Sequence, residues 1–267
     1  MYTKKLLLCP PTHYDIEYEI NPWMHVENKV DQSSVHKEYE ALKAAYQKLG
    51  IAFAEIEQAQ GLPDMVYSAN FGFPIGNIFI KSNYKFDERK KEADYAADYF
   101  EKQGFEVKSL PEEIAFEGQG DLLTVGGNFF YGWGKRSDIE AKPYLEELLG
   151  KKLIDFKLVN PFYYHLDTCF APLNEETVAI NPVSFEQEGR ERIYKLFPNV
   201  IEVSTEDNHL IACNLVVVDN TIVIAKGISQ QLKDTFTKYG FSTHEVPTNE
   251  YRKGGGSVKC LTLEIYE

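Results

Sequence analysis

The residue with the clearest chemical potential is Cys260, which follows three glycines in the segment KGGGSVKC. A cysteine thiolate is a strong nucleophile, and glycines let a backbone approach a ligand closely. The segment lacks the GxxxxGK[ST] spacing of a phosphate-binding loop, and no helix is expected after it. Because an isolated cysteine is more often a small buried hydrophobe, Cys260 indicates catalysis only if suitable partners lie elsewhere in the chain.

Three other segments carry polar residues that could meet Cys260. They are DMVYSAN at 64–70, FEGQGD at 116–121 and HLDTCF at 165–170. His165 alone, like Cys260 alone, has a ready structural explanation. The elements that position these segments therefore decide whether they form a site.

Five polar residues open apolar segments at a nearly constant interval. In chain order they are Asn70, Asp121, Asp167, Asn214 and Cys260. Successive positions differ by 51, 46, 47 and 46 residues, and a further step back of 49 leads to Asn21. Four of the segments are paired apolar runs separated by Gly, Asn or Pro, which predicts β-hairpins. The interval predicts about five strand–hairpin–helix units of about 50 residues each.

Helices and strands alternate within this repeat. Helices are predicted at 33–49, 86–103, 138–149, 185–196 and 229–239. In the first, Ser33 is the predicted N-cap, apolar residues recur at three- and four-residue steps, and Gly50 follows the last turn. Short apolar segments after the helices predict the strands IAFAEIE, FEVKSL, LIDFKLV, VIEVS and FSTHEVP.

Each end of the sequence supplies one strand without a hairpin partner, KKLLLC at the start and CLTLEIY at the end. Pairing them would close the units into a ring and remove two free sheet edges. A closed ring would place the five opening residues around one axis. We therefore predict an α/β propeller with five-fold pseudosymmetry, as a single domain over 1–267. The alternative is an ordinary α/β sheet in which the spacing is accidental.

The overall composition limits the classes of function. A net charge of −13 argues against a nucleic-acid partner, which needs clustered Lys and Arg, but it does not oppose a cationic ligand. The first apolar run is too short for a signal peptide, and none approaches a membrane span. The four cysteines form no CxxC pair, and no His/Cys cluster predicts a metal site. We expect a cytoplasmic protein with reduced thiols and no membrane partner.

The order Glu…His-x-Asp…Gly-Gly-x-x-x-Cys and the opening CPPTHYDIEYEINPWM resemble the guanidine-modifying superfamily, the penteins. These include arginine deiminases, dimethylarginine dimethylaminohydrolases and glycine amidinotransferases, and their fold is a ring of five units. The resemblance covers essentially the whole chain. It implies that Cys260 is the nucleophile and His165 the general acid and base. It further implies that Glu117 orients His165 and that Asp167 binds the guanidinium.

Two departures from the common pattern refine this interpretation. FEGQGD is one residue longer than the acid-Gly-Gly-Asp motif of many members. The extra residue raises the question whether Asp121 keeps the usual position of a substrate-binding residue. Asn70 stands where deiminases carry an aspartate that clamps the guanidinium. This asparagine, DMVYSAN and the N-terminal segment resemble the arginine dihydrolases, which convert arginine to ornithine, two ammonia and carbon dioxide. An amide could donate to the urea oxygen of citrulline and retain it for a second attack.

The same resemblance implies residues for the far end of the substrate. Arg136 in WGKRSD and Arg89 in FDERKK resemble residues that bind the substrate carboxylate. Asp15 and Asn21 in the N-terminal motif are candidates for the α-amino group. For Arg89 the competing interpretation is a solvated helix start, since DERKKE is strongly charged.

The leading hypothesis is an arginine dihydrolase that forms a covalent amidino-thioether at Cys260 and needs no cofactor or metal. Within the same chemistry, a deiminase or dimethylarginine dimethylaminohydrolase would stop at citrulline, although similar dimethylarginine hydrolases tend to carry Lys where Asp167 stands. An amidinotransferase would pass the amidino group to an amine. A non-catalytic ribosome-binding factor of the same fold would lack the set of Cys260, His165 and Glu117. The sequence makes no prediction of oligomeric state.

Overall fold

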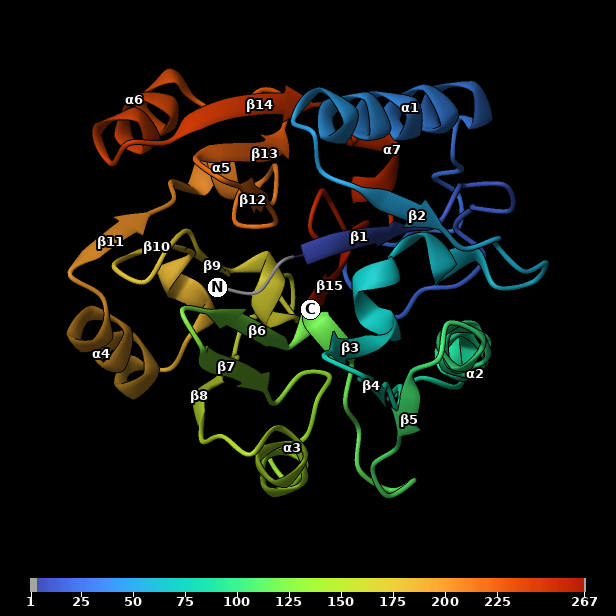
Figure 1. The fold of residues 1–267 in the computed structure, drawn as a ribbon. Helices are drawn as coiled ribbons and strands as arrows, with labels where there is room; N and C mark the ends of the chain where they lie inside the picture. Colours follow the sequence, from blue (N-terminus) through green and yellow to red (C-terminus); the bar gives the residue numbers. More distant parts are fainter. Residues whose placement is uncertain (1–3, 267) are drawn as a thin grey trace.

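Five similar units surround one axis in the computed structural model, which describes residues 4–266. In each unit an antiparallel pair of strands, a hairpin in all units but the first, is extended by a third strand that returns from a helix and pairs parallel with it. Figure 1 shows the helices at the periphery and the sheets nearer the centre. The α/β class and the repeated unit predicted from the spacing are confirmed.

The bounds of the elements follow the repeat. The first unit joins both ends of the chain and contains β15 (Leu263–Tyr266), β1 (Lys4–Leu8), α1 (Gln32–Lys48) and β2 (Phe53–Glu55). The second contains β3 (Gly72–Ile75), β4 (Ile78–Lys81), α2 (Asp87–Lys102) and β5 (Glu106–Lys108). The third contains β6 (Leu122–Val125), β7 (Asn128–Trp133), α3 (Ala141–Leu149) and β8 (Leu153–Lys157). The fourth contains β9 (Phe170–Pro172), β10 (Thr177–Ile180), α4 (Gln187–Leu196) and β11 (Asn199–Glu202). The fifth contains β12 (Val216–Val218), β13 (Thr221–Ala225), α6 (Gln230–Lys238) and β14 (Ser242–Val246).

The first and last strands of the chain pair with each other, as predicted. β1 runs antiparallel to β15, with Leu6 opposite Glu264 and Leu7 opposite Leu263. β15 also pairs parallel with β3 through Tyr266 and Ile75, so the first two units share one six-stranded sheet. This pairing fixes the segment before β15, which carries Cys260, against the strand that follows Asn70.

Helix α1 confirms the predicted apolar periodicity but begins at a different N-cap residue. Its N-cap is Asp31 rather than the predicted Ser33, because the Asp31 carboxylate accepts a hydrogen bond from the backbone N–H of Ser34 at 2.7 Å. Such a cap is worth about 1 kcal/mol. Val35 and Tyr46 are among the apolar residues that face inward. The helix therefore covers its unit through the stripe that the sequence indicated.

Short 3₁₀ helices deliver polar side chains to the axis. In the second, third and fourth units a 3₁₀ helix precedes the first strand: η2 (Ser68–Phe71), η3 (Gly118–Gly120) and η4 (Leu166–Thr168). Helices η1 (Pro63–Val66), η5 (Pro182–Ser184), α5 (Thr205–Asn208) and α7 (Asn249–Arg252) were not predicted. The turns η2 and η4 each contact η3.

Aromatic and aliphatic side chains fill the space between each helix and its sheet. In the second unit, for example, the rings of Phe79 on β4 and Phe100 on α2 stack with centroids 4.1 Å apart. Within residues 4–266, no helix combines the length and the hydropathy that a membrane span requires. The cores thus lie outside the axis and leave the axis to polar residues.

Candidate active site

The residues that open the units meet at the centre of the ring. The amide nitrogen of Asn214 lies 3.1 Å from the sulfur of Cys260, and that sulfur lies 3.4 Å from Asp167 Oδ2. Asn70 lies beside the next turn, because a Cβ atom on Gly120 would come within 2.4 Å of its amide nitrogen. The structure thus brings together the residues that the 46- to 51-residue interval singled out.

Cys260 is only 4% exposed, and its surroundings oppose ionisation. Burial raises the pKa of its thiol well above the ordinary value, and the adjacent Asp167 carboxylate raises it further. A neutral thiol is therefore the resting form. A cation placed between Cys260 and Asp167 would reverse this effect, because it would stabilise both anions.

His165 is held by the carboxylate that the sequence predicted. Its Nε2 lies 2.7 Å from Glu117 Oε2, and the same carboxylate accepts from Arg136 Nη1 at 3.1 Å. Burial acts to raise the pKa of Glu117, but Arg136 and His165 outweigh it and keep the pKa far below the usual range. Glu117 is therefore an anion that fixes the ring of His165 and can stabilise its protonated form.

The longer segment FEGQGD still places Asp121 at the axis. Asp121 accepts from the hydroxyl of Ser137 at 2.6 Å and from the backbone N–H of Leu166 at 3.0 Å. Burial raises its pKa to about 6. The side chain of Gln119 turns the other way and donates to the carbonyl of Glu264. The extra residue is thus accommodated without moving Asp121 away from His165, whose Nε2 lies 4.0 Å from Asp121 Oδ2.

Asp167 combines deep burial with an unused acceptor. It is 1% exposed, and its Oδ1 has no hydrogen-bond partner within the described part of the chain. Burial raises its pKa to about 7, against a smaller opposing effect of the Lys259 charge. A buried carboxylate with a free oxygen next to a thiol suits a ligand that is planar, cationic and rich in N–H donors.

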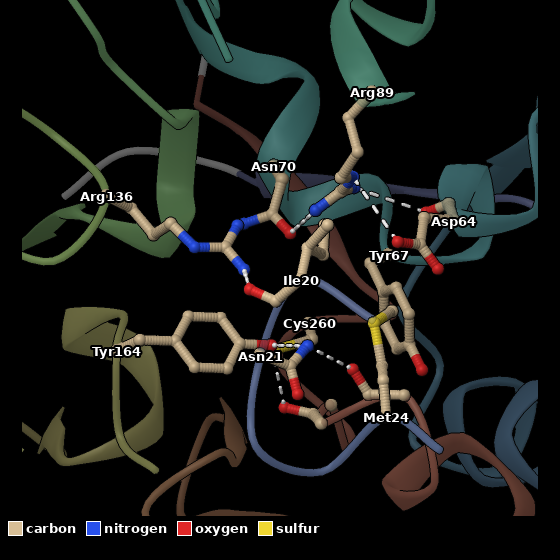
Figure 2. A pocket seen from close by; sticks show the side chains of 13 residues that line it. Ile20, Asn21, Met24, Asp64, Tyr67, Asn70, Arg89, Arg136, Tyr164 and Cys260 are labelled. Atoms are coloured by element: carbon tan, nitrogen blue, oxygen red, sulfur yellow. Dashed lines mark hydrogen bonds and ion pairs between the residues drawn. The ribbon is translucent and has the colours of Figure 1, made fainter. Parts of the chain in front are cut away.

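The amide of Asn70 is oriented by Arg89. Arg89 Nη1 donates to Asn70 Oδ1 at 3.1 Å, so the amide nitrogen points away from Arg89 (Figure 2). Arg89 is itself buried, and it pairs with Glu92 at 2.8 Å and donates to the carbonyl of Asp64 at 3.3 Å. The interpretation of Arg89 as part of a solvated helix start is therefore wrong. The amide nitrogen of Asn70 makes a long contact of 3.5 Å with the carbonyl of Glu117, and Asn70 thus presents a donor rather than an acceptor to the centre.

A small cavity beside Cys260 is shown in Figure 2. Its lining comprises Ile20, Asn21, Met24, Asp64, Tyr67, Asn70, Arg89, Arg136, Tyr164, Gly254, Gly255, Gly256 and Cys260. The glycines before Cys260 are required by close packing. A Cβ atom on Gly254 would lie 2.1 Å from the Tyr67 hydroxyl oxygen, and one on Gly256 would lie 2.4 Å from the Tyr67 ring.

The residues predicted for the far end of a substrate divide into two groups. Arg136 lines the cavity, donates to the carbonyl of Ile20 at 3.0 Å, and lies over the ring of Tyr164 at 4.4 Å. Asn21 also lines the cavity, and its amide donates to the hydroxyl of Tyr164 and to a glycine carbonyl. Asp15 is not among the lining residues; it accepts from the backbone of Val30 at 3.1 Å and so stabilises the N-terminal loop.

Several residues at the site received no role from the sequence. Asp64 and Tyr67 belong to the segment DMVYSAN, and Tyr164 directly precedes His165. All three line the cavity, but nothing in the sequence predicted this contact. Asn214 was found by the interval, but its bond to the Cys260 sulfur was not foreseen. The spacing was the signal for Asn214, because the equivalent positions of other units carry the predicted site residues.

The described residues offer neither a metal site nor a disulfide. No group of three or more His, Cys, Asp and Glu side chains within 4–266 is arranged to hold a metal ion. All four cysteines are buried and free. Burial raises the thiol pKa of Cys9, Cys169 and Cys213.

Comparisons with known proteins agree with this geometry. The family model for eukaryotic N,N dimethylarginine dimethylhydrolase matches residues 12–267. The chain is 36% identical to the bifunctional arginine dihydrolase/ornithine cyclodeaminase ArgZ of Synechocystis sp., over 98% of this chain and 38% of ArgZ. It therefore spans well under half the length of that relative. It is also 36% identical to the N(G),N(G)-dimethylarginine dimethylaminohydrolase of Mycobacterium tuberculosis, over 99% of this chain and 86% of that protein.

Solved structures extend the likeness to three dimensions. The crystal structure of the N-terminal domain of ArgZ bound to product, an arginine dihydrolase from Cyanobacteria, matches with a TM-score of 0.95 at 34% identity, and the match covers 99% of this chain and 98% of that one. The same domain has been solved bound to substrate, again with a TM-score of 0.95. The chain therefore belongs to the dimethylarginine dimethylaminohydrolase family of the guanidine-modifying, or pentein, superfamily.

Proposed function

We propose that this protein hydrolyses L-arginine to ornithine, two ammonia and carbon dioxide, with the consumption of two water molecules. The observation that carries the proposal is Asn70, a neutral amide whose oxygen is held by Arg89. Its nitrogen carries two hydrogens, of which one has a long contact of 3.5 Å with the carbonyl of Glu117, so the other can donate at the centre of the site. The likeness to the arginine dihydrolase domain of ArgZ supports the same choice.

The first round uses the predicted catalytic residues. Arginine binds with its guanidinium beside Asp167, and the cation favours the thiolate of Cys260, which lies 3.4 Å from that carboxylate. The thiolate attacks the guanidinium carbon, and His165 protonates the departing ammonia, which leaves an amidino-thioether. His165 then accepts a proton from water. The water oxygen attacks the same carbon, the carbon–sulfur bond breaks, and citrulline remains.

The second round requires that citrulline stay bound. Two carboxylate clamps would favour a cation and repel the urea oxygen, whereas the amide nitrogen of Asn70 can donate to it. Cys260 then attacks the urea carbon, and a second ammonia leaves. Hydrolysis of the resulting thiocarbamate gives the carbamate of ornithine, which loses carbon dioxide.

The rest of arginine is assigned to the cavity beyond Cys260. We propose that Arg136 binds the α-carboxylate, because its guanidinium lines the cavity between aromatic rings at 4.4 and 4.7 Å. Arg89 can assist through the second N–H of Nη1, while its first N–H holds Asn70. Asn21 is proposed to contact the α-amino group, and its position in the lining of the same cavity supports this. The contacts of Asp15 support an indirect role, in holding the N-terminal loop.

Product stoichiometry tests the proposal. Purified protein is incubated with L-arginine, and ornithine, citrulline and ammonia are measured over time. We expect two ammonia for each ornithine and no lasting citrulline. One ammonia for each citrulline would identify a deiminase and overturn the proposal.

Hydrolysis of dimethylarginine is the second candidate. It is favoured by the family model and by the M. tuberculosis relative, which this chain matches over most of both lengths. In the same assay, turnover of dimethylarginine to citrulline and dimethylamine without turnover of arginine would establish it.

The setting of this activity is also part of the proposal. We propose that residues 1–267 form one catalytic domain, supported by the pairing of β1 with β15. A cytoplasmic location is supported by four buried cysteines in the free form. The proposed ligand is a small molecule, with no nucleic acid or membrane partner, and nothing is proposed on oligomeric state. Limited proteolysis, cell fractionation and thiol titration of the native protein test these statements.

A further inference from the structure

Asn214 lies directly before the fifth unit's first strand and is fully buried beside the nucleophile. Its Oδ1 accepts hydrogen bonds from the backbone N–H groups of Ser257 and Cys260, both at 3.0 Å. These two donors fix the orientation of the Asn214 amide. If the amide were flipped, its NH₂ group would face two backbone N–H groups and no hydrogen bond could form. The Asn214 nitrogen must therefore face the sulfur.

The two hydrogens of that nitrogen have two acceptors. One is the backbone carbonyl of Asp167 at 3.1 Å, and the other is the Cys260 sulfur at 3.1 Å. Every polar atom of the amide is thus in use, and the side chain cannot turn away from the sulfur without losing several hydrogen bonds. The donor is preorganised before any substrate arrives.

This donor opposes the two largest influences on the thiol pKa of Cys260 and acts in the same direction as a backbone hydrogen bond from Ser257. Burial and the Asp167 carboxylate both raise the thiol pKa, whereas a hydrogen bond donated to the sulfur stabilises the thiolate. The sulfur is an anion before attack and again each time the carbon–sulfur bond breaks. A fixed donor at that position would stabilise the attacking and the leaving form.

We propose that Asn214 is a catalytic residue that donates a hydrogen bond to the Cys260 thiolate. The proposal rests on the proposed function only in that Cys260 is the nucleophile. It holds equally for an enzyme that stops at citrulline. The donor acts on the sulfur, whereas Asn70 acts on the bound substrate.

Asn214 also has a structural role that the test must separate. Its backbone carbonyl accepts from the N–H of Lys259 at 3.3 Å, so it helps to hold the loop that carries Cys260. Asn214→Asp keeps the shape and an oxygen for the two backbone N–H groups but replaces the donor to sulfur with a carboxylate oxygen. Because that charge would itself raise the thiol pKa, Asn214→Leu removes the donor without adding a charge and should raise the thiol pKa as well. A displaced Cys260 loop would change substrate binding, whereas loss of the hydrogen-bond donor changes the pKa of the Cys260 thiol.

The pKa of the Cys260 thiol is measured in the absence of substrate. The rate of alkylation by iodoacetamide is measured from about pH 7 to about pH 11, because burial raises the thiol pKa of Cys260. Cys260→Ser is the blank for the other cysteines. We expect Asn214→Asp to raise the apparent thiol pKa by about one unit or more, and to lower kcat for arginine by about 10- to 100-fold, with a smaller change in KM. Asn208→Asp, a buried asparagine whose amide donates to the carbonyl of Val203, is the matched control and should leave the thiol pKa unchanged.

An unchanged thiol pKa in a folded Asn214→Asp protein would overturn the proposal, whatever its effect on stability. A second measurement uses the wild-type protein, so that a variant that fails to fold does not leave the matter open. The side-chain amide resonances of Asn214 should titrate with the Cys260 thiol in nitrogen-15 spectra and lose that titration in Cys260→Ser. Amide resonances that ignore the thiol titration would refute the hydrogen bond. Wild-type product stoichiometry separately reports on the proposed function.

Discussion

At the scale of single residues, the site is a set of carboxylates and a thiol whose charges depend on the ligand. Burial holds the pKa of Asp167 at about 7 and that of Asp121 at about 6, and it raises the pKa of Cys260. Glu117 is the exception, since Arg136 and His165 keep it ionised. The free site is therefore poised to change its protonation when a cation binds.

Arginine binding should release a proton in a predictable pH range. The guanidinium stabilises ionised Asp167 and lowers its raised pKa, so the carboxyl must lose any proton it carries in the free protein. With a pKa of about 7, the expected release is about 0.9 proton at pH 6 and about 0.1 at pH 8. Binding should accordingly strengthen as pH rises through 7. Calorimetry of Cys260→Ser in buffers of different ionisation enthalpy measures this, and Asp167→Asn should abolish most of the release.

Asn70→Asp should convert the product from ornithine to citrulline. The carboxylate would pair with Arg89 and the guanidinium and would repel the urea oxygen, so citrulline would leave after one round. Ammonia per arginine should fall from two to one, while arginine consumption continues. Ornithine and two ammonia from this variant would show that Asn70 does not decide how often Cys260 attacks.

At the scale of elements, the glycine segment before Cys260 is shaped by its neighbours. Gly254→Ala should reduce arginine turnover by at least about 10-fold, because its Cβ atom would lie 2.1 Å from the hydroxyl of Tyr67, which is itself bonded to the Tyr251 carbonyl at 2.6 Å. Gly189→Ala in α4 is the control, since the nearest atom would be 3.7 Å away. Steady-state kinetics of both variants decide the matter; full activity in Gly254→Ala would contradict the packing argument.

The elements also show how far sequence patterns reach. The five longer α-helices were predicted within three residues at each end, because apolar periodicity and terminal glycines are local signals. The 3₁₀ turns that carry Asn70 and Asp167 were not predicted, since three or four residues contain no period. Whether Arg89 is solvent-exposed at the start of a helix or buried against Asn70 depends on a contact between residues 19 positions apart in sequence. No local pattern encodes such a choice.

At the scale of the whole molecule, a buried cluster behind the site ties the ring together. Lys259 Nζ donates to Gln119 Oε1 at 2.7 Å and pairs with Glu264 at 3.2 Å. Gln119 lies in η3, between Glu117 and Asp121, whereas Lys259 directly precedes Cys260. The cluster therefore joins the third unit, which fixes His165, to the strand that closes the ring.

Lys259→Met should destabilise the fold by about 3 kcal/mol, because it removes a buried cation together with its hydrogen bond to Gln119 and its ion pair with Glu264. The double variant Lys259→Met/Glu264→Gln should recover part of the loss, since it also removes the negative charge that Lys259 pairs with. The Lys259 charge also lowers the pKa of Asp167, so the acid limb of kcat/KM should move to higher pH in Lys259→Met. Urea unfolding and pH–rate profiles measure the two effects. An unchanged unfolding free energy would mean that closure depends on the pairing of β1 with β15 alone.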